Sequence, residues 1–589
     1  MAYCEKLADL RRELARVPAD AVYLPFRGPH GEPDPAARFR DAEWLTGFSG
    51  RCDLVVTAHA AAAWVNRAQA AEAAACFTEA KVSLYYTDDP AAPTPLTWLA
   101  AQLTGGACVL VNGARISAAE AAKFRSRLTS AGMTLETSVD LVDRIRSGVP
   151  AMPFTPAWEM LPEDTGRTAA QKAAALRMAV SAAGATHCVL SSPEDIAWLF
   201  NLRGSDMTLS PLNYAYAMLA PAGIFLYIQI PRLTAGAAVM LDAQGITVAD
   251  YGRFGEALDA LPPDAVAAFD PAQLPFALRR RIRCSVLEIE DPVRAMRAVH
   301  TDAELAGTRA AALRGSAALF RAKLRLKARL SSEDTLTLGA AQELFLSEFR
   351  RGEKWLGTAE RPEFTLLTDG KTVSLDRTTV NTALPRRGLL TLRLAFHYMD
   401  GTCTLCDTLP LGTPSEGEVS ACTLTLRALL AGLGVPFPRG SRAAAADALV
   451  RRPFWEKGAD PEHTVGCGVG HVTRAAEWPD LSDNAETVLK EGVFLSLAPT
   501  CPRDCGPAVC FSAQTALTAR GSMLCAEPLT CVLPDPALVD AESLLPAEQA
   551  LLQSLAEDAA RRLEPLLREE EKEALASYLP ERRRGRHAR

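Results

Sequence analysis

The chain opens two of its segments in the same way, with a helical pattern followed by a short apolar strand. In the first, the amphipathic stretch Lys6–Val17 precedes the strand-like runs AVYLP and DLVVTA. In the second, AAQKAAALRMAVSAAG precedes THCVLSS. The Pro-rich stretch PAMPFTPAWEMLPED between them has the composition of a linker. We therefore expect two related α/β domains, residues 1–153 and 154–295.

The remaining segment, residues 296–589, has a different order of elements. It begins with two long helical patterns, TDAELAGTRAAALRGSAALFRAKLRLKARL and SEDTLTLGAAQELFLSEFRR. In the second, Ser332 is a candidate N-cap, with Glu333 and Asp334 in the first turn. Strand-like runs punctuated by Gly and Pro follow, and a helical stretch closes the segment. Helices followed by many strands predict an α+β domain.

Length and charge narrow the class of protein further. A chain of 589 residues is too long for one hydrophobic core. The net charge of −7 argues against a nucleic-acid-binding surface, and only the terminal run ERRRGRHAR is strongly basic, which we interpret as a solvated tail. No apolar run of about 18 residues predicts a membrane span. The charged N-terminus does not resemble a signal peptide, so we expect a cytoplasmic protein whose fifteen cysteines are mostly free.

Several motifs resemble one family along most of the chain. WLTGFSG (Trp44–Gly50) and SPEDIAWLFNLRGSD (Ser192–Asp206) resemble the first and second domains of three-domain aminopeptidase P, the Xaa-Pro aminopeptidases of the pita-bread metallopeptidases. RAVHTDAELAGTRAAALRGSAAL, HYMDGT, LGTP, GVG and LKEGVFLSLAP resemble its third domain. The resemblance implies two creatinase-like N-terminal domains and a C-terminal pita-bread domain, commonly in a homodimer. Active relatives remove an N-terminal residue that precedes proline.

The resemblance also implies a metal site. Two metal ions, usually manganese, lie between two aspartates, one histidine and two glutamates. Carboxylate oxygens and imidazole suit such cations, and a metal pair activates the attacking water while polarising the scissile carbonyl.

The family's motifs place all five ligand positions on other residue types in this chain. In RLAFHYMDGTCTLCDTLPLGTP the motif residues are present without a gap, and the two aspartate positions fall on Arg393 and Thr404. HTVGCGVG puts Cys467 at the histidine ligand and His463 at a second family histidine that contacts substrate. The glutamate positions fall on Ala498 and Ser512.

None of the five replacements is a conventional ligand for manganese, and a guanidinium repels a cation. Asp407 does not substitute for Thr404, because three residues along a strand it points to the opposite face. We therefore expect no metal and no cofactor.

This pattern indicates a non-catalytic homologue that binds a peptide or protein in the degenerate cleft, or that regulates an active relative by dimerising with it. An altered peptidase, with Cys467 as nucleophile and His463 as base, is one alternative. A purely structural dimer is another.

Two further hypotheses concern side chains near the vestigial positions. Cys406, Cys467 and Cys510 could converge there and bind zinc or serve a redox role, or they could simply fill space as buried apolar residues. Arg393 could take the place of one metal and hold a carboxylate or carbonyl of a ligand. Alternatively, it forms a salt bridge to one of three carboxylates: Asp400, Glu477 or Asp504.

Overall fold

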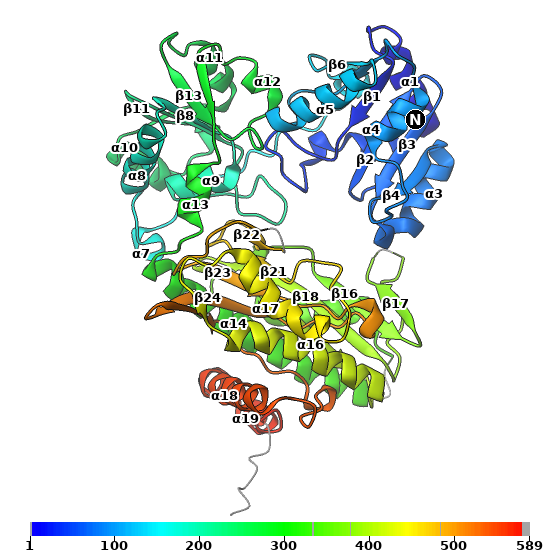
Figure 1. Cartoon of the computed structure of the whole chain (residues 1–589), viewed down its shortest axis with the longest axis vertical. Helices are drawn as coiled ribbons and strands as arrows, with labels where there is room; N and C mark the ends of the chain where they lie inside the picture. The colour runs from blue at the N-terminus through cyan, green and yellow to red at the C-terminus, as the bar shows by residue number, and fades with distance from the viewer. Residues whose placement is uncertain (1–2, 333–334, 377, 483–484, 580–589) are drawn as a thin grey trace, which may run out of the picture. The chain divides into compact units, whose positions relative to one another are not determined.

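The computed structural model describes residues 3–332, 335–376, 378–482 and 485–579 (Figure 1). The chain divides into two compact units. The N-terminal unit is Met1–Leu161 with Arg167–Val293, and the C-terminal unit is Pro162–Gly166 with Arg294–Arg589. The expected basic tail, residues 581–589, lies outside the described residues. None of the described helices combines the length and the apolar character that crossing a bilayer requires.

The N-terminal unit contains two six-stranded sheets with the same strand order. The first has the order β4-β3-β2-β1-β5-β6 and the second β12-β11-β10-β8-β13-β14. The first consists of β1 (Ala21–Leu24), β2 (Cys52–Thr57), β3 (Ala61–Val65), β4 (Ser83–Tyr86), β5 (Cys108–Leu110) and β6 (Thr134–Glu136). The second consists of β8 (His187–Leu190), β10 (Tyr216–Ala220), β11 (Gly223–Ile228), β12 (Ile246–Asp250), β13 (Val266–Phe269) and β14 (Ser285–Glu288).

The strand directions in these two sheets also correspond one to one. Strand β1 in the first sheet and strand β8 in the second each run antiparallel to one neighbour and parallel to the other. The outermost strand pair at each edge of both sheets is parallel. The helices include α1 (Tyr3–Leu14), α3 (Ala70–Ala80), α5 (Ala118–Ser130), α8 (Ala169–Ala182), α9 (Pro193–Phe200) and α10 (Ala235–Ala243). Two sheets of the same α/β type confirm the predicted fold class, and the domain bounds 1–153 and 154–295 stay a prediction.

The motif SPEDIAWLFN has a structural explanation in helix α9. Ser192 caps the helix by accepting a hydrogen bond from the backbone N–H of Asp195, and Pro193 occupies the first turn, where no N–H donor is needed. Asn201 ends the helix in the left-handed conformation, with φ of 53°. The buried Lys172 donates to the Trp198 carbonyl and to Asn201 Oδ1, at 2.8 and 2.5 Å, and so satisfies the C-terminal end.

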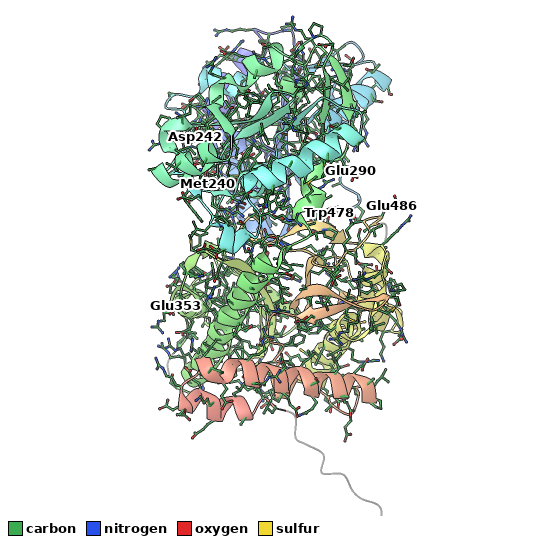
Figure 2. All side chains as sticks on the ribbon, turned by 90° about the vertical axis from the view of Figure 1, so that its left-hand side faces the viewer. Met240, Asp242, Glu290, Glu353, Trp478 and Glu486 are labelled. Carbon is green, nitrogen blue, oxygen red and sulfur yellow. The ribbon has the colours of Figure 1, made fainter. Side chains whose placement is uncertain are left out.

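The C-terminal unit is organised around the long helix α14 (Asp302–Ser331). Thr301 and Glu304 form a capping box at its start. Helices α18 (Pro546–Leu563) and α19 (Glu569–Ala576), at the bottom of Figure 2, lie against it. The three helices share an apolar cluster that includes Phe320. The N-cap predicted at Ser332 is wrong, because α14 continues to Ser331. The next helix, α15 (Leu338–Arg350), is capped by Thr337, and Glu333 and Asp334 lie outside the described residues.

Two sheets complete this unit. In the first, β18 (Leu389–Tyr398) pairs with β19 (Gly401–Pro410) and with β15 (Trp355–Thr358) and β16 (Glu363–Thr368), and β17 (Lys371–Ser374) pairs with β16. The second has the order β20-β25-β24-β23-β21-β22. Its members are β20 (Phe437–Pro438), β21 (Gly466–Gly468), β22 (Glu477–Leu481), β23 (Phe494–Leu497), β24 (Ala513–Arg520) and β25 (Met523–Pro528). With α16 (Glu416–Gly434) and α17 (Ala443–Trp455), this is the predicted α+β architecture.

Close packing of α14 on the β18–β19 hairpin fixes the position of the hairpin. A Cβ atom added at Gly307 of α14 would overlap the backbone carbonyl of Asp400, in the turn of the hairpin. A Cβ atom added at Gly417 of α16 would meet nothing within 4 Å.

We predict that Gly307→Ala lowers the free energy of unfolding of the C-terminal unit by about 1–3 kcal/mol, because backbone must move to admit the methyl group. Gly417→Ala is the matched control and should be neutral or stabilising by up to about 1 kcal/mol, since alanine favours a helix. Differential scanning calorimetry of both variants measures this. Equal transition temperatures would contradict the close packing.

Candidate functional site

The β18–β19 hairpin carries the first two vestigial ligand positions on one face. Arg393 lies opposite Cys406 in the strand register, and Ala395 lies opposite Thr404. Cross-strand partners, and residues two apart on a strand, point to the same side of a sheet. Arg393, Thr404 and Cys406 therefore share a face.

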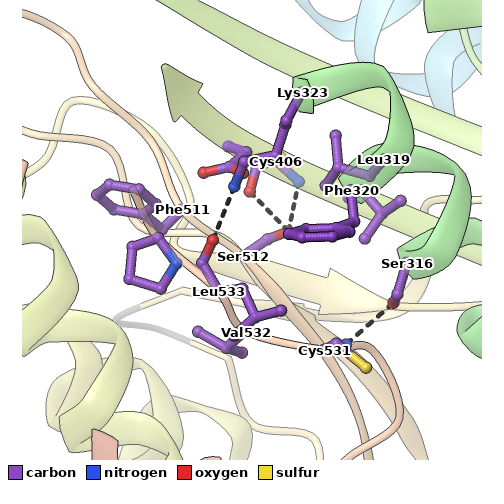
Figure 3. Close-up of a pocket in the computed structure, with 13 residues that line it drawn as sticks. Ser316, Leu319, Phe320, Lys323, Cys406, Phe511, Ser512, Cys531, Val532 and Leu533 are labelled. Atoms are coloured by element: carbon purple, nitrogen blue, oxygen red, sulfur yellow. Dashed lines mark hydrogen bonds and ion pairs between the residues drawn. The ribbon is translucent and has the colours of Figure 1, made fainter. Parts of the chain in front are cut away.

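Hydrogen bonds connect this face to the second sheet. The Cys406 N–H donates to the Ser512 hydroxyl at 2.5 Å, and the Ser512 N–H donates to the Cys406 carbonyl at 3.0 Å (Figure 3). The Thr404 hydroxyl donates to the Ser496 hydroxyl at 3.1 Å, and Ser496 lies opposite Cys467 in the register of β23 and β21. Ala498 follows two residues after Ser496. The structure thus brings the vestigial positions into one connected region.

Arg393 holds a permanent positive charge in this region. One guanidinium nitrogen donates to the Thr500 hydroxyl, and another lies 3.9 Å from the Cys406 sulfur. Its ion-pair partner is Glu363 on β16, at 3.9 Å. The neighbouring Cys510 and Cys406 sulfurs raise the pKa of Arg393, so the group stays charged.

The salt-bridge partners predicted for Arg393 are wrong. Among the described residues, its carboxylate partner is Glu363 and not Asp400, Glu477 or Asp504. Asp400 pairs with Arg314 and Lys354, and Glu477 pairs with Arg297. Glu363 was missed because it is a cross-strand neighbour of Arg393 from a strand that lies thirty residues earlier, a pairing that no short motif marks.

The three candidate thiols separate into a pair and a single residue. The Cys406 thiol donates a hydrogen bond to Cys510, which with the guanidinium of Arg393 lowers the pKa of Cys510 to about 7, whereas the pKa of Cys406 is raised. Burial, then the charges of Glu360 and Asp480, raise the pKa of Cys467 to about 12, although the charge of Arg393 acts in the opposite direction. The described residues include no group of three or more His, Cys, Asp or Glu side chains placed to hold a metal ion.

The proposed nucleophile–base couple is not assembled either. His463 is exposed, and its backbone carbonyl accepts a hydrogen bond from Arg451 at 3.0 Å. No hydrogen bond joins its ring to Cys467 among the described residues, and a thiol with a pKa near 12 is protonated at neutral pH.

Gln514 and Thr500 are site residues that the sequence analysis missed. The fully buried Gln514 accepts from the Thr404 N–H and donates to the Thr402 carbonyl, both at 2.9 Å. It lies two residues after Ser512, so alternation along the strand could have placed it on the same face. Thr500 accepts from Arg393 and hydrogen-bonds to Cys510. Nothing in its sequence context marks that role.

Asp407 points to the other face of β19, as predicted. It pairs with the buried Lys323 of α14 at 2.7 Å, and Lys323 also donates to the Leu533 carbonyl at 2.7 Å. Both side chains line a cavity of about 30 Å³ next to Phe320 and Cys531 (Figure 3). That volume holds one or two water molecules and not a peptide.

Family comparisons agree with this architecture. Residues 148–304 match the creatinase/prolidase N-terminal domain, and residues 307–518 match metallopeptidase family M24. The chain therefore combines creatinase-type N-terminal architecture with a C-terminal M24 pita-bread domain.

Relatives that match 81% of this chain indicate which kind of metallopeptidase it resembles. A probable Xaa-Pro aminopeptidase P from Sclerotinia sclerotiorum is 26% identical over 489 residues, 81% of this chain and 79% of that protein. Its counterpart from Ajellomyces dermatitidis is 28% identical over 499 residues, 81% and 80% of the two chains. The structure of X-prolyl aminopeptidase from Caenorhabditis elegans, a cytosolic enzyme with a di-nuclear active site, superposes with a TM-score of 0.90 at 22% identity. It covers 98% of this chain and 100% of that one, and shows the shared fold. The chain is a homologue of Xaa-Pro aminopeptidase P, as its motifs suggested.

We predict that iodoacetamide at pH 8 modifies the exposed Cys4 and leaves Cys467 largely unmodified. A thiol with a pKa of about 12 is a thiolate in only roughly one molecule in ten thousand at that pH. Peptide mapping by mass spectrometry measures both sites. Cys467 reacting faster than Cys4 would restore the thiol-peptidase alternative.

We also predict that Lys323→Met costs about 3–5 kcal/mol of stability at neutral pH, because it leaves the Asp407 carboxylate buried without its partner. Burial raises the pKa of Asp407, so the folded variant binds a proton more readily than the unfolded chain. Its stability should therefore recover as pH falls through that raised pKa. Urea unfolding at several pH values measures this.

The control for that experiment is the double variant Lys323→Met, Asp407→Asn, which removes both charges and should regain most of the loss without the same pH dependence. A single variant as stable as the wild type would mean that the pair contributes little.

Proposed function

We propose that this chain is a non-catalytic homologue of Xaa-Pro aminopeptidase P that binds a peptide or protein segment at the face carrying Arg393. The observation that carries the proposal is a guanidinium at the position where the family motif calls for the first metal-binding aspartate. Arginine stays protonated in proteins and has no lone pair to offer a metal. A divalent cation beside it would meet repulsion instead of a ligand.

The other four vestigial positions support the same proposal. Thr404 and Ser512 present hydroxyls, Cys467 a protonated thiol and Ala498 a methyl group. Two-metal hydrolysis needs ligands that hold both ions and an ion that generates the attacking hydroxide. We infer that the five replacements together remove that mechanism.

The exposure of Arg393 and its long ion pair with Glu363 support peptide binding. Its side chain is 36% exposed, and its ion pair with Glu363 is long, at 3.9 Å, with Glu363 itself 66% exposed. Such a pair is weak and exchangeable. A planar guanidinium pairs well with a carboxylate or carbonyl oxygen, so a peptide group can displace Glu363. The relatives named above are Xaa-Pro aminopeptidases, which makes Pro-containing peptides the first class to test.

The homodimer and the cytoplasmic location belong to the same proposal. All fifteen cysteines are free thiols, as expected of a protein kept in a reducing compartment. The C. elegans protein is a cytosolic enzyme. Sedimentation equilibrium across a range of concentrations measures the oligomeric state.

We predict that a fluorescently labelled Xaa-Pro peptide binds the wild-type chain and is recovered intact. Arg393→Ala should weaken binding by about tenfold or more, because a hydrogen bond to a charged group contributes roughly 1.5–3 kcal/mol. Glu363→Gln should tighten binding, because it removes the competing carboxylate.

Arg520→Ala is the matched control, since Arg520 is an exposed arginine at the far end of β24. Fluorescence polarisation gives the affinities, and mass spectrometry shows whether the peptide is cleaved. Equal affinity for wild type and Arg393→Ala, or cleavage of the peptide, would overturn the proposal.

A further inference from the structure

We propose that Cys406 and Cys510 form a redox site, closing a reversible disulfide when the protein meets a peroxide. The placement of the two cysteines on adjoining segments carries the proposal, together with the guanidinium of Arg393 at 3.9 Å from the Cys406 sulfur. It does not depend on peptide binding, because the reaction needs only the two sulfurs and the oxidant.

The backbone brings the two cysteines together. Cys406 exchanges hydrogen bonds with Ser512 through both its N–H and its carbonyl. Two residues further along, Thr408 does the same with Cys510: its hydroxyl donates to the Cys510 carbonyl at 3.0 Å and accepts from the Cys510 N–H at 3.1 Å. Cys406 and Cys510 are therefore diagonal neighbours of two antiparallel segments. Closing an S–S bond between diagonal positions requires a small shift of the backbone as well as rotation of both side chains.

Charge and access distinguish this pair from the other thiols. The attacking species is a thiolate, which an adjacent cation stabilises. Arg393 reaches Cys406, and the Thr500 hydroxyl that accepts from Arg393 also hydrogen-bonds to Cys510. Cys510 is buried, whereas Cys406 is partly exposed and Arg393 is 36% exposed, so a molecule the size of hydrogen peroxide has a short approach.

The reaction balances with hydrogen peroxide as the oxidant. One thiolate attacks a peroxide oxygen, the O–O bond breaks, and the sulfur becomes a sulfenic acid while the released hydroxide takes a proton to form water. The second thiol loses its proton and attacks that sulfur. The S–S bond forms, and the S–O bond breaks to give a second water. Two thiols are oxidised and one peroxide is reduced, and an added dithiol reverses the change.

The disulfide would change the surroundings of Arg393. Neither sulfur of a disulfide can carry negative charge, so oxidation removes the negative charge that a thiolate would place beside the guanidinium. Its charge then becomes available to an anionic ligand.

The experiment uses the full reduced chain treated with hydrogen peroxide, quenched, alkylated and analysed by mass spectrometry. We expect a loss of two hydrogen masses per chain, a cross-linked peptide containing Cys406 and Cys510, and recovery with dithiothreitol. Cys406→Ser and Cys510→Ser should each abolish the cross-link, and the control Cys467→Ser should retain it. Arg393→Gln should slow the reaction by about tenfold or more at neutral pH.

Mapping of the wild-type protein keeps the test decisive even where a variant fails to fold. Cross-linking through other cysteines, single-site sulfinic acid without a cross-link, or no mass change would each overturn the proposal. Failure of peptide binding at Arg393 would leave the disulfide result unchanged, so the two proposals are tested separately.

Discussion

The connection between the β18–β19 hairpin and the start of β24 is the contact on which the rest of the C-terminal site depends. The Cys406 N–H donates to the Ser512 hydroxyl and the Ser512 N–H donates to the Cys406 carbonyl, and the buried Gln514 joins the Thr404 N–H to the Thr402 carbonyl. Buried amide groups must find partners, and each partner here comes from the opposite sheet. The two sheets are thereby held in register by the protein's own polar groups.

This arrangement explains how the region stays ordered with residues that do not suit a metal ion. The Thr404 hydroxyl donates to the Ser496 hydroxyl, and the Ser512 hydroxyl accepts from the Cys406 N–H. The guanidinium of Arg393 forms an ion pair with Glu363, donates a hydrogen bond to Thr500 and lies near the two thiols. On the other face, the buried pair of Lys323 and Asp407 links α14 to β19. Polar networks of this kind specify one arrangement when every member has a partner.

The sequence predicts most of the fold because its signals are local. Helix-then-strand openings indicate two related domains, and the strand order of both sheets agrees. The motif residues around Tyr398 and Gly401 fall at the hairpin turn, and the register of the hairpin puts Arg393 and Thr404 on one face. Asp407 is placed on the other face by the same alternation.

The features that could not be predicted from the sequence depend mainly on contacts between residues far apart in the chain. The partner of Arg393 comes from β16, and a side chain that long can reach carboxylates on several strands. The grouping of thiols was also uncertain, because strand alternation gives a face and not a distance: Cys406 meets Cys510, while Cys467 faces other charges. The cap was misplaced at Ser332 because Ser332 and Thr337 are both favourable N-cap residues, and α15 begins after Thr337.

The central claim is that Arg393 and its neighbours replace a metal pair. Manganese titration of the purified chain, followed by elemental analysis of the dialysed protein and an Xaa-Pro cleavage assay, tests it most directly. The account predicts no manganese above background and no cleavage at any metal concentration. Stoichiometric manganese together with cleavage would contradict it, and would mean that the metal ligands lie on residues other than the five assigned.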